Sequence, residues 1–341
     1  MKLSFNISKK YNHFFFVQTL ADWHFSCRQE YIDDWLAKTG PLTGNEKNSL
    51  DAFRVMLQKH GFGELKNSQA ANVFDFFMRF DEFTDKSVFS ADEINIYLAA
   101  MDALETRFEK IWAMGQNGLV QAKKLLENVF DRDKDMISGD LKKLFANHID
   151  LDRSLEVILL LSTEDSGAGA GGANNGPNII TLECSGTHAA DLGYLLSTLW
   201  HEMIHLIMAD YISEAATQME INETAIVASI QVEKADFKYF EELVAFSLFS
   251  PMSFLTRKYF HTDLSGKLQS AVSKNDIQWL LHAKYVFVMY LIYLNGQYLE
   301  ESLKGDRSIP PEEMAKAFIE NHQVVDDYFR DNGARPEWLS Y

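Results

Sequence analysis

The chain has 341 residues, of which 47% are hydrophobic and 24% charged, the composition of a globular protein with one large domain or two smaller ones. Its formal net charge of −17 argues against nucleic acid and anionic membranes as partners, because phosphate binding needs a basic surface. The two cysteines, Cys27 and Cys184, give no disulfide framework, and no secretory signal is visible, so we expect a cytoplasmic protein.

The first 150 residues are predicted to form a mainly helical N-terminal region. Hydrophobic residues recur at helical spacing in three stretches, residues 51–59, 68–80 and 91–130. The charged, glycine-containing stretch 131–139 is predicted to be a turn that ends the third helix. Phenylalanines gather in this region, Phe14 to Phe16 among them, and we expect them to pack in a core rather than to line a ligand groove.

Two strands are predicted after the helical region. Residues 155–162 form a short apolar run bounded by polar residues, and residues 178–184 form a second run. The segment between them, residues 166–177, contains five glycines and is either a hairpin loop or a flap. It is not a phosphate-binding loop, because no Gly-Lys-Ser/Thr closes it. We therefore divide the chain into an N-terminal region, residues 1–150, and a second domain, residues 151–341.

The sequence His201-Glu202-Met203-Ile204-His205 indicates a metal site. Hydrophobic residues at helical spacing predict a helix over residues 189–207, in which positions four apart share a face. Two imidazoles on one face suit two ligands of a tetrahedral zinc ion, with Glu202 beside a bound water. The flanks of the motif carry no charge, as expected of a helix that lies in a cleft. The alternative is a buried helix whose histidines bond to each other or to backbone carbonyls.

A catalytic zinc site also needs a third protein ligand and an open fourth position. Glu241 and Glu242 begin an apolar run that we expect to be helical and to end at Pro251. An HExxH motif followed by a Glu-x-x-Ala helix resembles the gluzincin metallopeptidases, and the arrangement is similar to uncharacterised bacterial predicted zinc-dependent proteases. The third zinc ligand of gluzincins is the glutamate of Glu-x-x-Ala. The resemblance covers about residues 155–251 and implies this role for Glu242.

Three other glutamates remain open as the third ligand. Glu223 follows the second histidine at close to the thermolysin-like interval, but it lacks the small residue three positions later. Glu241 is in the position that is usually the neighbour of the ligand, and Glu214 is a further alternative. The chain also departs from the family at Phe246, where thermolysin-like enzymes place an aspartate that orients a zinc histidine.

Other zincin families fit less well. Metzincins continue the motif with a glycine and a histidine, and this chain has Met208 and Tyr211 at those positions. The Gly-x-Met-Glu-Asn element of gluzincin aminopeptidases is missing, so an endopeptidase is favoured over an aminopeptidase.

The resemblance implies an α+β fold that is predominantly helical, with a zincin-like catalytic core and a small sheet. It implies one Zn²⁺ per chain, held by His201, His205 and Glu242, and peptide-bond hydrolysis in which Glu202 is the general base that activates a zinc-bound water. A peptide or protein substrate would pair with strand 178–182, which precedes the metal helix. A Tyr or His of a later helix would stabilise the oxyanion, and the candidates are Tyr285, Tyr290, His282 and His261.

The alternative function is a non-catalytic zincin-fold protein that serves as a binding module or scaffold. Glu202 argues against it, because a site that only holds zinc needs no base between its ligands. Residues 252–341 are predicted to be helical. Within them, residues 279–294 are strongly apolar but short for a membrane span and contain His282 and Lys284, so we expect a buried helix and no membrane partner.

Overall fold

The computed structural model describes residues 1–23, 27–59, 90–163, 172–174, 178–184, 192–218, 237–250, 253–261 and 286–331. The chain divides into two compact units. Unit 1 comprises Met1–Asn128 and Ser154–Leu195, and unit 2 comprises Val129–Arg153 and Leu196–Tyr341. This division does not coincide with the expected boundary at residue 150, because the N-terminal strand pairs with a strand that begins at Ser154. The helix expected at residues 68–80 lies outside the described residues.

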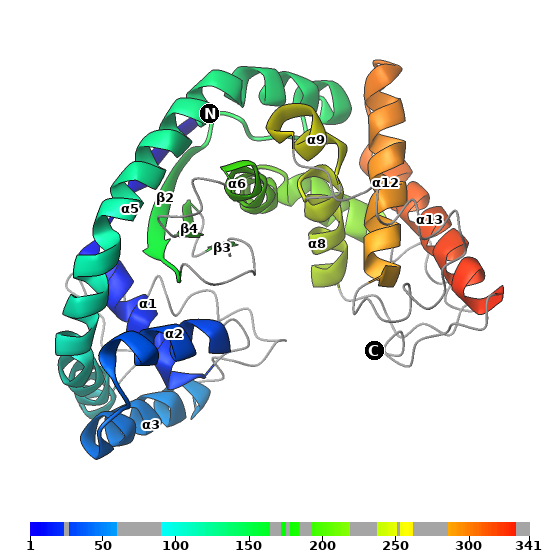
Figure 1. The fold of residues 1–341 in the computed structure, drawn as a ribbon. Coiled ribbons are helices and arrows are strands. Elements are labelled where there is room, and N and C mark those ends of the chain that lie inside the picture. The colour runs from blue at the N-terminus through cyan, green and yellow to red at the C-terminus, as the bar shows by residue number, and fades with distance from the viewer. Residues whose placement is uncertain are drawn as a thin grey trace. The chain divides into compact units, whose positions relative to one another are not determined.

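Unit 1 is built on a four-stranded sheet with the order β1-β2-β4-β3. Strands β2, β4 and β3 are labelled in Figure 1. Strands β1 (Lys2–Asn6), β2 (Ser154–Leu161) and β4 (Ile179–Cys184) are parallel, and β3 (Gly172–Asn174) is antiparallel to β4. β2 is the central parallel strand, and Val157–Leu161 are buried on both faces, which explains the apolar sequence of this part of the strand. The two predicted strands are thus confirmed, and the described residues form a predominantly helical α+β protein, as predicted.

Strand β4 has a neighbour on each side. Ile180 to Leu182 pair with β2 on one edge and with β3 on the other. β3 lies in the glycine-rich segment, so that segment and β4 form a short antiparallel pair. The edge that a substrate peptide would need at residues 180–182 is therefore occupied by the chain itself.

The helices of unit 1 enclose an aromatic core. Helices α1 (Lys9–Ala21), α2 (Gln29–Thr39) and α3 (Gly44–Lys59) contribute buried rings, which include Phe14, Phe15, Phe16, Trp35 and Phe53. The predicted core role of Phe14 to Phe16 is confirmed by ring contacts such as that of Phe16 with Trp35, at 4.9 Å between centroids. Asn12 ties α1 to β2, since its side chain donates to the Leu159 carbonyl (3.0 Å) and accepts from the Leu161 amide (2.6 Å).

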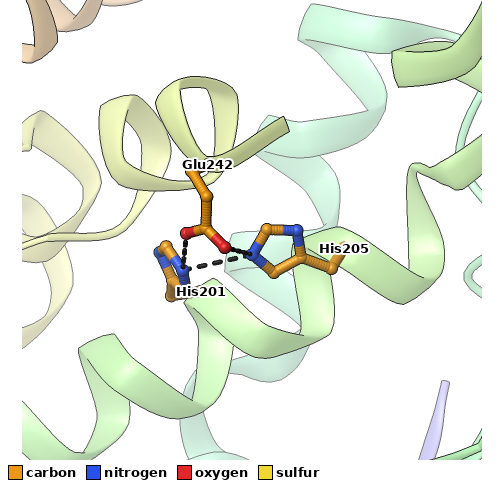
Figure 2. A group of neighbouring side chains, drawn as sticks. All are labelled: His201, His205 and Glu242. Carbon is orange, nitrogen blue, oxygen red and sulfur yellow. Dashed lines mark hydrogen bonds and ion pairs between the residues drawn. The ribbon is translucent and has the colours of Figure 1, made fainter. Parts of the chain in front are cut away.

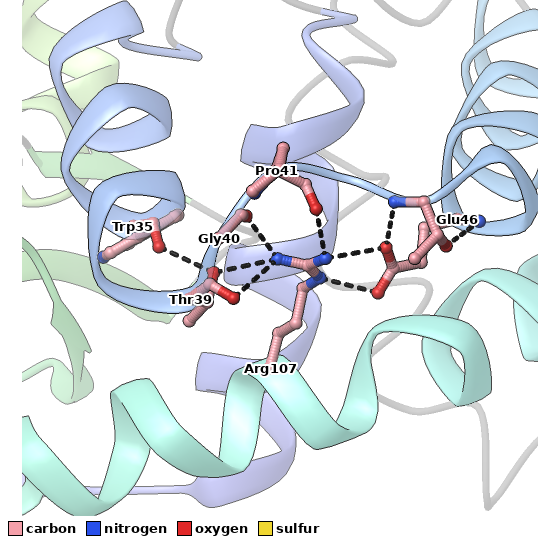
Figure 3. Close-up of polar contacts among 7 residues, drawn as sticks. Trp35, Thr39, Gly40, Pro41, Glu46 and Arg107 are labelled. Carbon is pink, nitrogen blue, oxygen red and sulfur yellow. Dashed lines mark hydrogen bonds and ion pairs between the residues drawn. The ribbon is translucent and has the colours of Figure 1, made fainter.

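A buried arginine fixes the connection between α2 and α3. Arg107 donates to both carboxylate oxygens of Glu46, at 2.6 and 2.9 Å (Figure 3). It also donates to the carbonyls of Thr39, Gly40 and Pro41, at 3.2, 2.5 and 2.6 Å. The guanidinium thus satisfies carbonyls left over at the end of α2. These hydrogen bonds hold the pKa of Glu46 at about 2, well below its usual value.

Arg107 belongs to α5 (Ala91–Phe145), a single helix of 55 residues. The turn predicted at residues 131–139 is wrong, because α5 continues through it. The charged residues of that stretch form local ion pairs, such as Lys134 with Asp131 at 2.6 Å. Ile137 and Leu141 are fully buried and preserve the apolar face, so one glycine does not end the helix.

Unit 2 contains the C-terminal part of α6 (Leu192–Ile207), together with α8 (Phe237–Leu248), α9 (Phe254–Phe260), α12 (Val286–Lys304) and α13 (Pro311–Asp331). α12 packs against α8 and α13 (Figure 1). It overlaps the apolar stretch 279–294, of which residues 279–285 are outside the described part. Among the described helices, none combines the length and the hydropathy needed to cross a membrane.

Helix α6 is fixed in unit 2 by packing and by its C-terminal hydrogen bonds. Trp200 is buried, with its ring stacked on those of Phe130 and Phe249, at 5.7 and 5.4 Å between centroids. The last carbonyls of the helix accept hydrogen bonds from the Asp150 amide (2.9 Å) and from the Arg153 guanidinium. The residues that follow Trp200 are therefore held at a defined position.

Candidate metal centre

His201 and His205 lie on one face of α6, one turn apart, as their spacing predicts. Their side chains are buried, and their Nε2 atoms are 3.2 Å apart. Figure 2 shows the two imidazoles pointing toward the same position. The sequence-based prediction of a helix here is confirmed, with its described part beginning at Leu192.

Glu242 approaches this position from α8. Its Oε2 is 3.3 Å from Nε2 of His201, and its Oε1 is 3.7 Å from Nε2 of His205 (Figure 2). The Glu242 side chain is 40% exposed, while those of the histidines are 8% and 7% exposed. We call His201, His205 and Glu242 the metal triad, since their ligand atoms lie within 4.8 Å of one another.

The spacing of the two imidazole nitrogens and the Glu242 carboxylate is close to that around a tetrahedral zinc ion. Zinc bonds of about 2.0–2.1 Å at the tetrahedral angle place neighbouring ligand atoms about 3.3 Å apart. The two Nε2 atoms are 3.2 Å apart, and the nearer Glu242 oxygen is 3.3 Å away for His201 (Oε2) and 3.7 Å away for His205 (Oε1). Two imidazole nitrogens and one carboxylate oxygen are also a ligand set that zinc uses in catalytic sites. The residues present therefore fit this ion in both chemistry and spacing.

The second nitrogens of the two imidazoles have different surroundings. Nδ1 of His205 lies 2.9 Å from Oε1 of Glu241, at hydrogen-bonding distance. Nδ1 of His201 is buried and has no hydrogen-bond partner among the described residues. The ring of Phe246 lies against the His201 imidazole instead, with 4.2 Å between centroids.

Glu202 is a buried carboxyl close to the triad. It is 9% exposed, and burial raises its pKa from 4.5 to about 7. Positive charge on His205 would lower the pKa, whereas the carboxylates of Glu242 and Glu241 raise it further. A carboxyl with a pKa near neutrality can both accept and release a proton at physiological pH.

The structure separates the candidates for the third ligand. Glu242 is the described glutamate whose carboxylate faces both Nε2 atoms. Glu241 faces the opposite side of the His205 ring. Glu214 is an exposed residue whose carboxylate lies 4.0 Å from His148, and Glu223 is outside the described residues.

The candidates for oxyanion stabilisation are only partly described. Tyr285 and His282 lie outside the described residues. Tyr290 is on α12 with its ring against Tyr328, at 5.5 Å, and His261 follows the last turn of α9 with a left-handed backbone conformation. No described contact joins Tyr290 or His261 to the metal triad.

Two features of the centre were not predicted from the sequence. These are the hydrogen bond between Nδ1 of His205 and the Glu241 carboxylate and the packing of Phe246 on His201. The sequence signal for the first is the pair of adjacent glutamates, Glu241 and Glu242. Comparisons of this chain with family models, with curated proteins and with solved structures gave no match.

Proposed function

We propose that this protein is a zinc-dependent peptidase of the gluzincin type, with a zincin-like catalytic core. His201, His205 and Glu242 would hold one Zn²⁺ per chain, and Glu202 would be the general base. The observation that carries the proposal is the approach of the two Nε2 atoms (3.2 Å) and of the Glu242 carboxylate to each of them (3.3 and 3.7 Å), with the buried Glu202 in the same turn of α6. The order of β4 and α6 along the chain, a strand followed by the metal helix, is that of zincins.

The charges around the triad also favour a cation. The carboxylates of Glu202, Glu241 and Glu242 are close enough to interact, and the two latter raise the pKa of the first. When all three are ionised, they carry three negative charges beside two imidazoles. A divalent cation would offset this repulsion. Its attraction to the carboxylates would be stronger than at an exposed site, because His201, Glu202 and His205 are buried from water.

A bound zinc ion would act as a Lewis acid toward the scissile carbonyl and lower the pKa of water toward neutrality. Glu202 would accept a proton from the attacking water as the C–O bond forms. It would then give that proton to the nitrogen of the leaving amine as the C–N bond breaks. A carboxyl whose pKa is near neutrality is suited to both transfers.

The substrate in this proposal is a peptide or protein cut at an internal bond. The sequence lacks the element with which gluzincin aminopeptidases capture a free N-terminus. Cys27 and Cys184 do not form a disulfide, in keeping with the cytoplasmic location that we propose.

The test combines metal analysis with one substitution. We expect the purified protein to contain one zinc per chain and to cleave members of an internally quenched peptide library. Glu202→Gln should keep the zinc and lose about 10²- to 10⁴-fold in activity, because it removes only the base. Glu214→Gln changes an exposed glutamate of the same unit and should keep both properties.

Two outcomes would contradict the proposal. Absence of stoichiometric zinc would exclude the metal centre, and full activity of Glu202→Gln would exclude Glu202 as the base. Bound zinc without cleavage of any library member would instead support a non-catalytic zincin-fold binding protein.

A further inference from the structure

Glu241 contacts the side of the His205 ring that faces away from the metal triad. Its Oε1 is 2.9 Å from Nδ1, whereas Nε2 of the same ring faces His201 and Glu242. One carboxylate oxygen therefore lies on each side of the His205 imidazole. Of the two carboxylates, that of Glu242 also faces His201, with its Oε2 3.3 Å from Nε2 of His201.

A carboxylate at Nδ1 decides which nitrogen of an imidazole carries the proton. When Nδ1–H donates to Glu241, Nε2 keeps its lone pair free for a metal ion. The hydrogen bond also holds the plane of the ring. His205 is buried, with a side chain 7% exposed, so this orientation meets little competition from water.

The two glutamates can do this because they are adjacent on α8. Successive side chains of a helix point about 100° apart, so Glu241 and Glu242 can reach two sides of one ring. The position that carries an orienting aspartate in thermolysin-like enzymes is Phe246 here, and it packs on His201. Among the described residues, Glu241 is the carboxylate that hydrogen-bonds to the imidazole nitrogen of a triad histidine that does not face the metal position, Nδ1 of His205.

We propose that Glu241 is a positioning residue that fixes the tautomer and the orientation of His205 for metal binding. This inference rests on the proposed function for one point, the identity of the bound ion as zinc. It assigns Glu241 no contact with substrate and no place among the ligands. It also explains how the centre functions with a phenylalanine at position 246.

The test measures zinc affinity and the His205 tautomer in Glu241→Ala and Glu241→Gln. Zinc affinity is obtained by competition with a chelator, and ¹⁵N NMR of the histidine side chains reports the tautomer with and without zinc. We expect Glu241→Ala to weaken zinc binding about 10- to 100-fold, the range typical of such outer hydrogen bonds. Glu241→Gln should lie between it and wild type, because its amide oxygen can still accept from Nδ1–H.

The NMR readout separates positioning from a merely structural role. In wild type, His205 should be the Nδ1–H tautomer even without metal, and in Glu241→Ala both tautomers should be populated. Glu214→Ala is the matched control, since Glu214 also lies near a histidine Nδ1, that of His148, at 4.0 Å. It should leave zinc affinity and the His205 signals unchanged.

The outcomes distinguish this inference from the proposed function. If wild type binds zinc and both Glu241 variants bind it equally well with an unchanged tautomer, the role of Glu241 is refuted while the metal centre stands. If wild type binds no zinc, the metal centre and the role of Glu241 are refuted together.

Discussion

The phenyl ring of Phe246 lies 4.2 Å from the imidazole of His201, centroid to centroid, at an interplanar angle of 48°. The Nδ1 atom of that imidazole is buried without a hydrogen-bond partner among the described residues. The orientation of His201 therefore depends on packing, whereas that of His205 depends on a hydrogen bond to Glu241. The two histidines of the triad are held by different forces.

Removal of the Phe246 ring should loosen His201. We expect Phe246→Ala to weaken zinc binding by about 2- to 10-fold, the equivalent of one aromatic contact. Phe246→Leu should retain most of the affinity, because it keeps an apolar side chain against the ring. Val324→Ala on α13, another exposed apolar residue, should have no effect. Equal zinc affinities for wild type and Phe246→Ala, measured by chelator competition, would show that the ring does not position His201.

Exchange of the third ligand should abolish tight zinc binding. Glu242→Gln removes the charge of the carboxylate that faces both Nε2 atoms, so its loss of affinity should exceed the roughly 100-fold upper range for residues that hydrogen-bond to the ligands. Glu223→Gln, at the rival position, should leave the affinity unchanged. Metal analysis after dialysis against a weak chelator tests both variants. The reverse result, zinc lost only in Glu223→Gln, would transfer the ligand role to Glu223.

The stability of the metal-free protein should depend on pH through Glu202. Its pKa in the folded state, about 7, is above its ordinary value of 4.5, so folding favours the protonated form. Below about pH 4.5 the carboxyl is protonated in both states and costs nothing. Between pH 4.5 and 7 the Glu202 carboxyl ionises in the unfolded state but not in the folded state, which lowers the free energy of unfolding. Above pH 7 this loss of stability levels off at roughly 3 kcal/mol.

Glu202→Gln removes this penalty because glutamine does not ionise. In the presence of a chelator, its free energy of unfolding should exceed that of wild type at pH 8, and the difference should shrink toward pH 5. Urea unfolding at several pH values measures both proteins. With zinc bound, the difference should become smaller, since a cation lowers the pKa of a nearby carboxyl. Parallel pH profiles of the two metal-free proteins would contradict the burial of an ionisable Glu202.

Loss of the Arg107 guanidinium should destabilise unit 1. Arg107→Met leaves the partly buried Glu46 carboxylate and three backbone carbonyls without this donor, at a cost of about 3–5 kcal/mol. Arg54→Met is the control, because Arg54 is 38% exposed and pairs with the exposed Asp51, and it should cost less than about 1 kcal/mol. Chemical unfolding monitored by circular dichroism measures both costs. Similar costs for the two variants would contradict the role assigned to Arg107.

Two glycines of α5 should respond to alanine in opposite directions. A Cβ atom at Gly115 would lie 2.2 Å from Cδ1 of Leu161, whereas a Cβ at Gly139 would meet no atom within 4 Å. Gly139→Ala should therefore stabilise the protein by about 0.5–1 kcal/mol through helix propensity. Gly115→Ala should destabilise it, and Leu161→Ala should relieve part of the clash in the double variant. A stabilising Gly115→Ala would show that Leu161 moves away without cost.

The parts of the fold that the sequence predicted are those encoded locally. The spacing of His201 and His205 and the apolar face of α6 lie within 16 residues, and β2 contains a continuous apolar run, Val157–Leu161. β1 was not predicted, because it has five residues and pairs with β2 about 150 positions away. The false turn at residues 131–139 arose because charged residues and a glycine resemble a loop when their local ion pairs and the buried Ile137 are not visible.

The centre was predictable in part for the same reason. Two ligands and the base lie in one turn of one helix, and family resemblance suggested Glu242. The role of Glu241 depends on the rotation of α8 about its axis relative to His205, which only tertiary packing determines. The same holds for Phe246, whose sequence position suggested a missing hydrogen bond but not an aromatic contact.

Because β3 pairs with β4, any ligand that binds to this edge of β4 as an extended strand must compete with β3. Gly172 to Asn174 and Ile180 to Leu182 are joined by a short stretch of the same chain. A tethered strand of this kind has an effective concentration on the order of millimolar, against which a free peptide must compete. Recognition through backbone amides at this edge would thus require the glycine-rich strand to leave first, which would make its release a gating step.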